Sequence, residues 1–318
     1  MPHSQTALPA EADETRQQAP RGNRVTLTRW AQRATPYLFI TPSLFGVLAF
    51  SLVPVLMAGV ISFTSWNLLS TPHFTGTANY TQLFHDTRSL MDFARSGEFV
   101  LLTVPLQTAL AIVLALLMRR KFPGRTFFRA IFVLPWLSTP VVVAVIWRFL
   151  IDPTTGPFAQ FLSFFGIHTG YWLQSTTLAL PAIALMTAWQ FVGYNALFFL
   201  AGLQSIPTYL DEAAMLDGAS TWQRFWRLTL PLLGPTTLFV VVTNVIGGFQ
   251  SFDMVYVLTQ GGPNMSSEVV NYRIYELGFQ QFDAGYASAV AMVLFLIILL
   301  FTVIQLRFAN KHVTYDIS

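Results

Sequence analysis

Six stretches of about twenty mostly apolar residues constrain the fold of this chain more than any other feature. They cover residues 37–63, 99–118, 130–150, 178–203, 230–250 and 287–308. Each is long enough to cross a hydrocarbon layer of about 30 Å as an α-helix. Of the 318 residues, 53% are hydrophobic and only 10% are charged, whereas soluble domains carry roughly 25% charged residues. The sequence therefore predicts an all-α integral membrane protein with six transmembrane helices.

Lysine and arginine divide unevenly between the two sides of such a bundle. If the N-terminus lies in the cytoplasm, the outer segments hold only Arg88, Arg95 and Arg273, with Arg148 near the outer end of the third stretch. Cytoplasmic segments are the ones enriched in basic residues. We therefore expect both termini in the cytoplasm, on the side of the remaining basic residues, which are Arg16, Arg21, Arg24, Arg29, Arg33, Arg119, Arg120, Lys121, Arg125, Arg129, Arg224, Arg227, Arg307 and Lys311.

The sequence divides into a polar N-terminal tail and one transmembrane domain. Residues 1–30 are polar and rich in Pro, Gln, Glu and Arg, which predicts a disordered cytoplasmic tail. Residues 31–318 then form one transmembrane domain.

Cysteine is absent, which excludes disulfides, thiolate metal sites and a cysteine nucleophile.

One cytoplasmic segment, residues 205–231, is not explained by the membrane and is expected to form two short helices. Thr208 with Asp211 has the spacing of a capping box for the first helix. Gly218 suits the left-handed residue that ends it. Ser220 with Gln223 has the spacing of a second capping box. The second helix then runs toward Pro231, which is expected in the first turn of the fifth span.

The first of these helices combines small and apolar side chains. Ala213 and Ala214 allow close approach of another backbone, and Met215 and Leu216 offer apolar contacts. Such a helix, held between two spans, is suited to docking into a cleft of another protein and passing movement to both spans. An amphipathic connector lying on the membrane surface is the alternative, and the residues alone leave both open.

The spacing of this segment resembles a known family. Glu212-Ala213-Ala214, then Gly218, then Leu228-x-Leu230-Pro231 resembles the EAA loop of binding-protein-dependent ABC importer permeases, with leucine in place of the usual isoleucine. Residues 128–136, 140–147, 258–263, 275–276 and 285–289 are similar to the maltose and glycerol-3-phosphate type of carbohydrate permease. The chain resembles a six-span form of that subunit, with the type I importer fold.

The resemblance implies partners and a site. The EAA helix is a coupling helix that contacts an ATPase subunit in that family, which implies this role for Glu212, Ala213, Ala214 and Gly218; the predicted coupling site also includes Met215 and Asp217. The implied partners are an ATPase dimer that holds the ATP and Mg, a second permease subunit, an extracytoplasmic solute-binding protein and the lipid of a bacterial plasma membrane, with no nucleic acid.

This chain is not expected to be an enzyme. Neither of its two lysines, Lys121 and Lys311, follows the glycine that a P-loop requires. No metal-binding or catalytic constellation is present, and all five histidines lie outside the six stretches. An ion-coupled secondary transporter is the remaining alternative, although ionisable residues, which such proteins use, are absent from the middle of the stretches.

A solute path is expected where uncharged polar and aromatic side chains recur on helical faces. The alternative is that these polar groups only hold helices together, and the resemblance slightly favours the path. The predicted path residues are Gln190, Tyr194, Asn195, Asn244, Gly248, Gln250 and Ser251.

The expected solute is a neutral sugar or sugar-like molecule. Only Arg148 and Arg273 are expected near the path, and a phosphorylated solute would require such cations. Glycerol-3-phosphate or a phosphodiester is the alternative.

Overall fold

The computed structural model describes residues 37, 39–120, 122–167 and 171–312. The chain divides into two compact units, Met1–Leu56 and Met57–Ser318. The described part of the first unit is helical and contains the π-helical segment η1 (Leu48–Leu52). Helix α2 (Val53–Ile61) begins there and ends in the second unit. The predicted tail, residues 1–30, lies outside the described residues.

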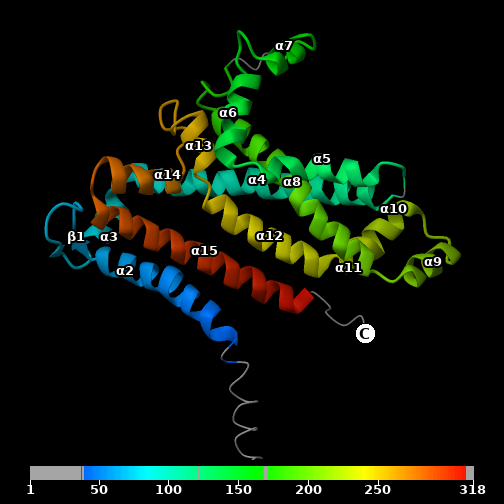
Figure 1. Ribbon diagram of the computed structural model, residues 1–318, viewed down its shortest axis with the longest axis horizontal. Coiled ribbons are helices and arrows are strands. Elements are labelled where there is room, and N and C mark those ends of the chain that lie inside the picture. The colour runs from blue at the N-terminus through cyan, green and yellow to red at the C-terminus, as the bar shows by residue number, and fades with distance from the viewer. Residues whose placement is uncertain (1–36, 38, 121, 168–170, 313–318) are drawn as a thin grey trace, which may run out of the picture. The chain divides into compact units, whose positions relative to one another are not determined.

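Four long helices of the second unit, α4 (Thr87–Arg119), α8 (Ala179–Ser205), α12 (Gly234–Phe249) and α15 (Ala284–His312), lie side by side (Figure 1). Helix α4 packs on α8 and α12, and α12 packs on α15. Small buried residues such as Ala111, Ala115 and Ala196 line the contact between α4 and α8. Small side chains at these positions allow the close backbone approach on which helix association in membranes depends.

The apolar stretches correspond to four single helices and two broken pairs. Phe39–Ile61, Thr87–Arg119, Ala179–Ser205 and Ala284–Phe308 are each long and apolar enough to cross a membrane. Arg125–Leu137 with Pro140–Leu150 is bent by 100°, and Thr221–Leu232 with Gly234–Phe249 by 66°. The described residues thus contain four candidate spans, or up to six if each bent pair is one span. The count of six therefore stays a prediction.

The break in the third stretch has a local cause. Helix α5 (Arg125–Leu137) ends before Ser138, and α6 (Pro140–Leu150) starts after Thr139, which is extended with ψ of 142°. Proline lacks a backbone N–H and disfavours helical backbone at the residue before it. Pro140 therefore begins a new helix instead of continuing α5, and residues 130–150 do not form the single continuous helix that was expected.

The segment 205–231 contains the expected short helices, α9 (Thr208–Leu216) and α10 (Thr221–Arg224). Gly218 ends the first with a positive φ of 79°, as predicted. Ser220 and Gln223 form the predicted capping box, with backbone-to-side-chain bonds of 3.3 and 2.8 Å. The expected cap at Thr208 is wrong: Pro207 is the N-cap, and Thr208 is already helical and makes no side-chain cap bond.

The expected start of the fifth span is also wrong. Helix α10 continues through the π-helical η2 (Phe225–Thr229) into α11 (Leu230–Leu232), so Pro231 lies before the bend. Helix α12 begins at Gly234 and has Pro235 in its first turn. A second proline, four residues further on, thus occupies the position expected for Pro231.

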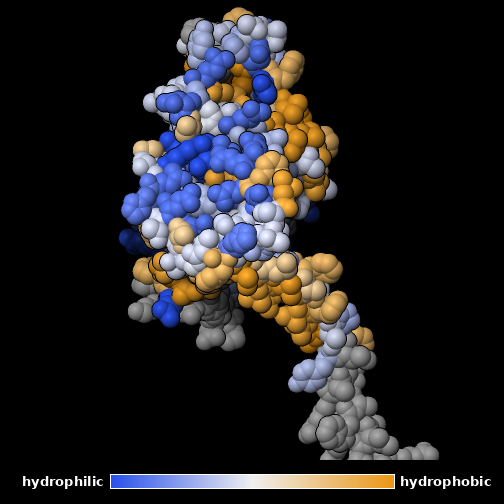
Figure 2. Space-filling model, turned by 90° about the vertical axis from the view of Figure 1, so that its left-hand side faces the viewer, coloured by the Kyte–Doolittle hydropathy of each residue, from blue (hydrophilic) through white to orange (hydrophobic). Residues whose placement is uncertain are grey.

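The remaining elements are short. Strands β1 (Thr64–Ser65) and β2 (His73–Phe74) pair antiparallel, with Thr64 opposite Phe74. The short helices are α3 (Ala78–His85), α7 (Pro157–Ser163), α13 (Asp253–Leu258), α14 (Val270–Tyr275) and the π-helical η3 (Glu276–Gln280). The elements β1, α3 and α14 gather at one end of the long helices and α9 and α10 at the other (Figure 1). Figure 2 shows that the first of these ends is largely hydrophilic.

Candidate functional site

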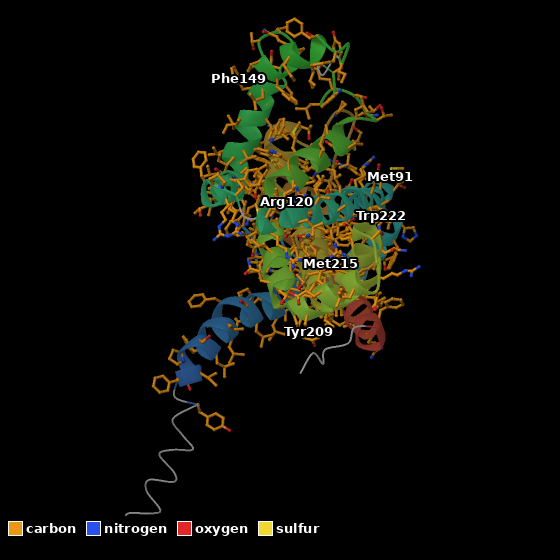
Figure 3. All side chains as sticks on the ribbon, turned by 90° about the vertical axis from the view of Figure 1, so that its right-hand side faces the viewer. Met91, Arg120, Phe149, Tyr209, Met215 and Trp222 are labelled. Carbon is orange, nitrogen blue, oxygen red and sulfur yellow. The ribbon has the colours of Figure 1, made fainter. Side chains whose placement is uncertain are left out.

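Helix α9 and the start of α10 expose apolar side chains on the end of the molecule seen in Figure 3. Leu216 is 90% exposed, Trp222 70%, Tyr209 62% and Met215 50%. Apolar side chains of this size clustered on an exposed surface indicate an interaction site. We call these four residues the α9 surface. The predicted coupling residues Glu212, Ala213, Asp217 and Gly218 are exposed on the same segment, and Ala214 is half-buried.

An ion pair holds α9 to α10. The guanidinium of Arg224 lies 2.9 Å from the carboxylate of Asp211, across the turn at Gly218. Helix α10 leads through η2 and α11 to the bend that precedes α12. Helix α9 is therefore connected to a long helix of the bundle by this ion pair and by the helical segment 221–232.

Several predicted path residues hold helices together. Gln190 and Asn195 are each only 1% exposed. The Gln190 amide donates to the Ser138 carbonyl at the break between α5 and α6, at 3.4 Å. The Asn195 amide donates to Asn244 Oδ1, at 3.3 Å, and joins α8 to α12. Gln190 Oε1 and the Asn244 amide nitrogen are buried without a hydrogen-bond partner, so both side chains retain capacity for a further polar contact.

The other path residues of α12 and its end differ in exposure. Gly248 packs against α4, where a Cβ would lie 2.9 Å from Val100 Cγ2. Its role here is close packing. Gln250 is exposed and Ser251 half-buried where α12 ends. The Asn271 amide donates to the Gln250 carbonyl at 2.9 Å, which ties this end of the helix to α14.

A row of aromatic rings crosses α5, α8 and α12. Trp136 stacks on Tyr194 with ring centroids 4.1 Å apart and planes 12° from parallel. Tyr194 contacts Phe198, which contacts Phe239, each with centroids 5.0 Å apart. Phe239 is 50% exposed and the other three are half-buried. Of these four residues, only Tyr194 was predicted from the sequence to line the solute path, although the spacing of Tyr194 and Phe198 places both on one face of α8.

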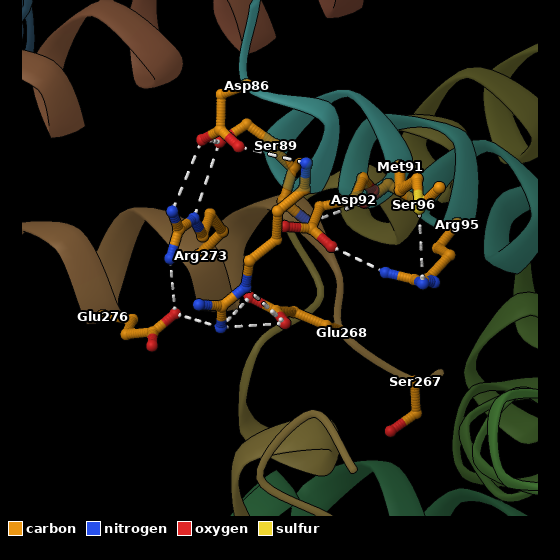
Figure 4. Close-up of polar contacts among 12 residues, drawn as sticks. Asp86, Ser89, Met91, Asp92, Arg95, Ser96, Ser267, Glu268, Arg273 and Glu276 are labelled. Carbon is orange, nitrogen blue, oxygen red and sulfur yellow. Dashed lines mark hydrogen bonds and ion pairs between the residues drawn. The ribbon is translucent and has the colours of Figure 1, made fainter. Parts of the chain in front are cut away.

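A cluster of ion pairs, absent from the sequence-based expectations, joins the start of α4 to the segment 268–276 (Figure 4). Arg88 contacts Glu268 at 2.9 Å and Glu276 at 2.6 Å. Arg273 contacts Glu276 at 2.9 Å and Asp86 at 3.4 Å. We call these five residues the outer ion cluster, after the outer segments to which Arg88 and Arg273 are assigned from the sequence. The Arg273–Glu276 pair has a local i,i+3 spacing, but the pairs that join this segment to α4 link residues 180 to 188 positions apart, which no local pattern reveals.

Hydrogen bonds and charge lower the pKa of two acids of this cluster, Asp86 and Glu276, whereas burial outweighs the contact with Arg88 and raises the pKa of Glu268. Partial burial alone would raise the pKa of Asp86, but bonds from Ser89 and Tyr286 and the charge of Arg273 outweigh it and lower the pKa to about 2. The pKa of Glu276 is likewise below its ordinary value, because bonds and charge from the two cluster arginines exceed the effect of burial.

The two arginines expected near a phosphorylated solute, Arg148 and Arg273, therefore differ in their ion pairing. Arg273 is 7% exposed and paired with Asp86 and Glu276, so its charge is already neutralised. Arg148 is exposed and forms no ion pair among the described residues; its one polar contact is the Val257 carbonyl at 3.5 Å. It lines a cavity of about 390 Å³ together with Asp152 and Gln174.

The neighbouring acid does not neutralise Arg148 by contact. The Asp152 carboxylate instead accepts hydrogen bonds from Thr154 and Thr155. Those bonds hold its pKa below the ordinary value. Within the described ranges, no group of three or more His, Asp or Glu side chains is placed to hold a metal ion.

Comparison with known proteins identifies the family. The profile described as "Binding-protein-dependent transport system inner membrane component" matches residues 107–312. The chain is 34% identical over 284 residues to the sn-glycerol-3-phosphate transport system permease protein UgpA of Rhizobium meliloti, covering 88% of this chain and 96% of the relative. It is also 34% identical over 285 residues to the probable ABC transporter permease protein YesP of Bacillus subtilis, covering 88% and 92%.

The fold matches a solved structure of a bacterial ABC transporter involved in the import of the acidic polysaccharide alginate. The TM-score is 0.76 at 22% sequence identity, covering 91% of this chain and all of the other. The same fold matches, with a TM-score of 0.77 at 22% identity and covering 90% of this chain and 97% of the other, the alginate transporter in complex with its pentasaccharide-bound periplasmic protein. This chain is therefore a multi-pass membrane permease rather than an enzyme, and it belongs to the family of binding-protein-dependent transport system inner membrane components.

Proposed function

We propose that this chain is one of two membrane-spanning subunits of an ATP-driven importer in a bacterial plasma membrane. In this proposal both termini and α9 face the cytoplasm, and a solute-binding protein delivers the solute to the end that carries α14. The distribution of basic residues supports this orientation. ATP and Mg are held by a separate ATPase dimer, and a second permease subunit lines the other half of the path.

The observation that carries the proposal is the α9 surface joined to α12. Tyr209, Met215 and Leu216 stay exposed although they are large and apolar, which supports a protein partner for this surface. The Arg224–Asp211 ion pair and the helical segment 221–232 connect that surface to the bundle. The ATPase, by moving α9, then changes the position of α12 and so opens or closes the solute path.

The solute path in this proposal follows the aromatic row from Trp136 to Phe239. Aromatic faces suit the C–H faces of sugar rings, and the free polar atoms of Gln190 and Asn244 suit their hydroxyl groups. Gly247 is exposed on α12 and leaves room beside the row. Gly248 serves the helix packing that fixes this face.

A neutral sugar or sugar-like solute is favoured, because the outer ion cluster neutralises the buried Arg273. Glycerol-3-phosphate or a phosphodiester is the second candidate, and a specific observation supports it: Arg148 lines an open cavity without an ion pair among the described residues. The name of the Rhizobium meliloti relative agrees with this second candidate.

An ion-coupled secondary transporter is the competing mechanism. Helix α4 starts twelve residues before the predicted span, and this added part contains the charged residues Arg88, Asp92, Arg95 and Glu98. They lie in the first twelve residues of the helix, and Arg95 pairs with Asp92 at 2.9 Å. Their position at a helix end and their pairing favour a structural role over a proton relay through the middle of the membrane.

The test is uptake by membrane vesicles that contain the chain and the subunits that copurify with it. We expect uptake to require ATP and to persist when an ionophore collapses the proton gradient. Glu212→Lys should abolish uptake and copurification of a P-loop ATPase while the chain still reaches the membrane, because it reverses the charge beside the α9 surface. Uptake without ATP that stops with the ionophore would instead establish the secondary transporter.

A further inference from the structure

A hollow of about 440 Å³ lies where α4 ends beside α10 and η2. From α4 it is lined by Leu116, Arg119 and Arg120, and from the other side by Trp222, Arg224 and Phe225. Its walls come from a candidate membrane span and from the segment that follows α9. This hollow is separate from the aromatic row and from the outer ion cluster.

The hollow carries an excess of positive charge. Arg224 is paired with Asp211, which also lines the hollow, whereas Arg119 and Arg120 form no ion pair within the part of the chain that the structure describes. The Nε of Arg224 is buried and has no hydrogen-bond partner. A buried donor without an acceptor is unfavourable, and the side chain that carries it lines the hollow.

The polarity of the hollow changes along α4. Arg119 is the last residue of that helix, and Leu116 lies one turn earlier, toward the middle of the span. Trp222, the member of the α9 surface that lies on α10, is 70% exposed and lines the charged end of the hollow together with Arg120. Tryptophan and arginine at the end of an apolar helix are typical of the level of the lipid headgroups.

We propose that this hollow binds the headgroup of an anionic phospholipid. The phosphate lies against Arg119, Arg120 and Arg224, and the glycerol and upper acyl chains lie along Leu116 and Phe225. Basic pockets between helices on the cytoplasmic side bind anionic lipid headgroups in this way. A bound lipid then bridges α4 and the segment that carries α9. The proposal concerns lipid binding and does not depend on which solute is moved or on what drives transport.

The apolar wall favours a lipid over a soluble anion. Inorganic phosphate would use only the arginines, whereas a phospholipid also covers Leu116 and Phe225. The side chain at Leu116 belongs to a candidate span and thus lies at a depth that lipid reaches.

The test measures lipid retained by the full-length chain together with the subunits that copurify with it. Native mass spectrometry in detergent compares phosphatidylglycerol with phosphatidylcholine of the same acyl chains, each with and without inorganic phosphate. We expect bound phosphatidylglycerol, little phosphatidylcholine, and no displacement by phosphate. Arg120→Gln should weaken binding of phosphatidylglycerol by about fivefold, which corresponds to one arginine at a membrane surface. Arg119→Gln should have a similar effect.

The matched control is Arg307→Gln. Arg307 is also an exposed arginine near the end of an apolar helix, but it does not line the hollow. We expect this variant to retain phosphatidylglycerol as the unaltered chain does, and thermal unfolding checks that all variants are folded. Equal retention by the Arg120 and Arg307 variants would overturn the proposal, as would equal binding of the two lipids. Displacement of phosphatidylglycerol by phosphate would show that the hollow binds a soluble anion instead. Exclusion of lipid from the assembled complex by an acidic segment of a partner subunit would also overturn the proposal.

Discussion

The carboxylate of Asp211 on α9 lies 2.9 Å from the guanidinium of Arg224 on α10. This pair closes the turn at Gly218 and holds two short helices together that otherwise share a single glycine turn. The Asp211 side chain is 37% exposed and that of Arg224 17%. The pair therefore adds little to global stability, about 0.2–1 kcal/mol for partly exposed ion pairs, and the role proposed for it is transmission between α9 and α12.

The first prediction is that Asp211→Asn uncouples transport without unfolding the chain. We expect uptake to fall severalfold while the free energy of unfolding changes by less than about 1 kcal/mol. Asp211→Glu, which can re-form the pair with a longer side chain, should retain most of the uptake. Uptake and ATP hydrolysis measured on the same membranes separate the two effects. Normal uptake by the Asn variant would exclude this pair from transmission.

The second prediction concerns the backbone at Gly218. Its φ of 79° lies in the left-handed region, and no atom is within 4 Å of a Cβ built there. Backbone strain rather than crowding should therefore decide the effect of a substitution. We expect Gly218→Val to destabilise the turn by roughly 1–2 kcal/mol and to impair coupling, whereas Gly218→Asn, which tolerates this conformation, should be mild. Hydrogen exchange of α9 measures the difference, and equal behaviour of both variants would contradict the strain argument.

The third prediction separates two roles of Asp86. Its carboxylate caps α4 through the Arg88 N–H at 3.0 Å, and it also contacts Arg273 at 3.4 Å and the Tyr286 hydroxyl at 2.8 Å. Asp86→Ala removes both roles and should lower the free energy of unfolding by about 2 kcal/mol. Asp86→Asn keeps a good N-cap and should lower it by about half as much. Thermal unfolding in detergent tests this order, which a purely electrostatic role would not produce.

The fourth prediction is a loss of stability in acid. The pKa of Asp86 falls from its ordinary value of 3.8 to about 2 in the folded protein, and that of Glu276 is also lowered. A lowered carboxyl pKa contributes stability that is present above the ordinary value and is lost as pH falls through the folded value. We therefore expect the contacts of Asp86 and Glu276 to weaken between about pH 4 and pH 2, with a smaller acid dependence in Asp86→Asn. Glu268, whose pKa is raised by burial, does not contribute to this loss. An unchanged pH profile in that variant would remove Asp86 as the cause.

The features that sequence predicted correctly are those with local causes. Hydropathy alone located the apolar stretches, and the positive φ of Gly218 and the capping box of Ser220 follow from residues within one turn. The failures also have local causes: Pro207 took the capping position expected for Thr208, and Pro140 started a new helix inside an apolar run.

The features that sequence could not predict depend on packing between distant segments. Arg273 is paired with Glu276, three residues further on, which helical spacing could have indicated, whereas its second partner, Asp86, is 187 residues away in the chain. Gly248 looked like part of a polar stripe, yet it faces Val100 of α4. Hydropathy and spacing describe one helix at a time, so they cannot tell which face of α12 meets a neighbour and which face stays open.

The last prediction uses Arg148 to distinguish the two solute classes. It is the outer arginine that lines an open cavity and has no ion pair among the described residues. If the solute is neutral, Arg148→Gln should change uptake by less than about twofold, because a neutral solute gains little from a cation. If the solute carries phosphate, the same change should reduce uptake by about tenfold or more, since a charge-assisted hydrogen bond contributes roughly 1.5–3 kcal/mol. In that case Arg148→Lys, which keeps the charge, should recover part of the uptake. The control is Arg95→Lys, at an ion-paired site, which should change the uptake of both solute classes to the same extent. Competition of uptake by glycerol-3-phosphate and by neutral sugars, measured in the same vesicles, decides between the two.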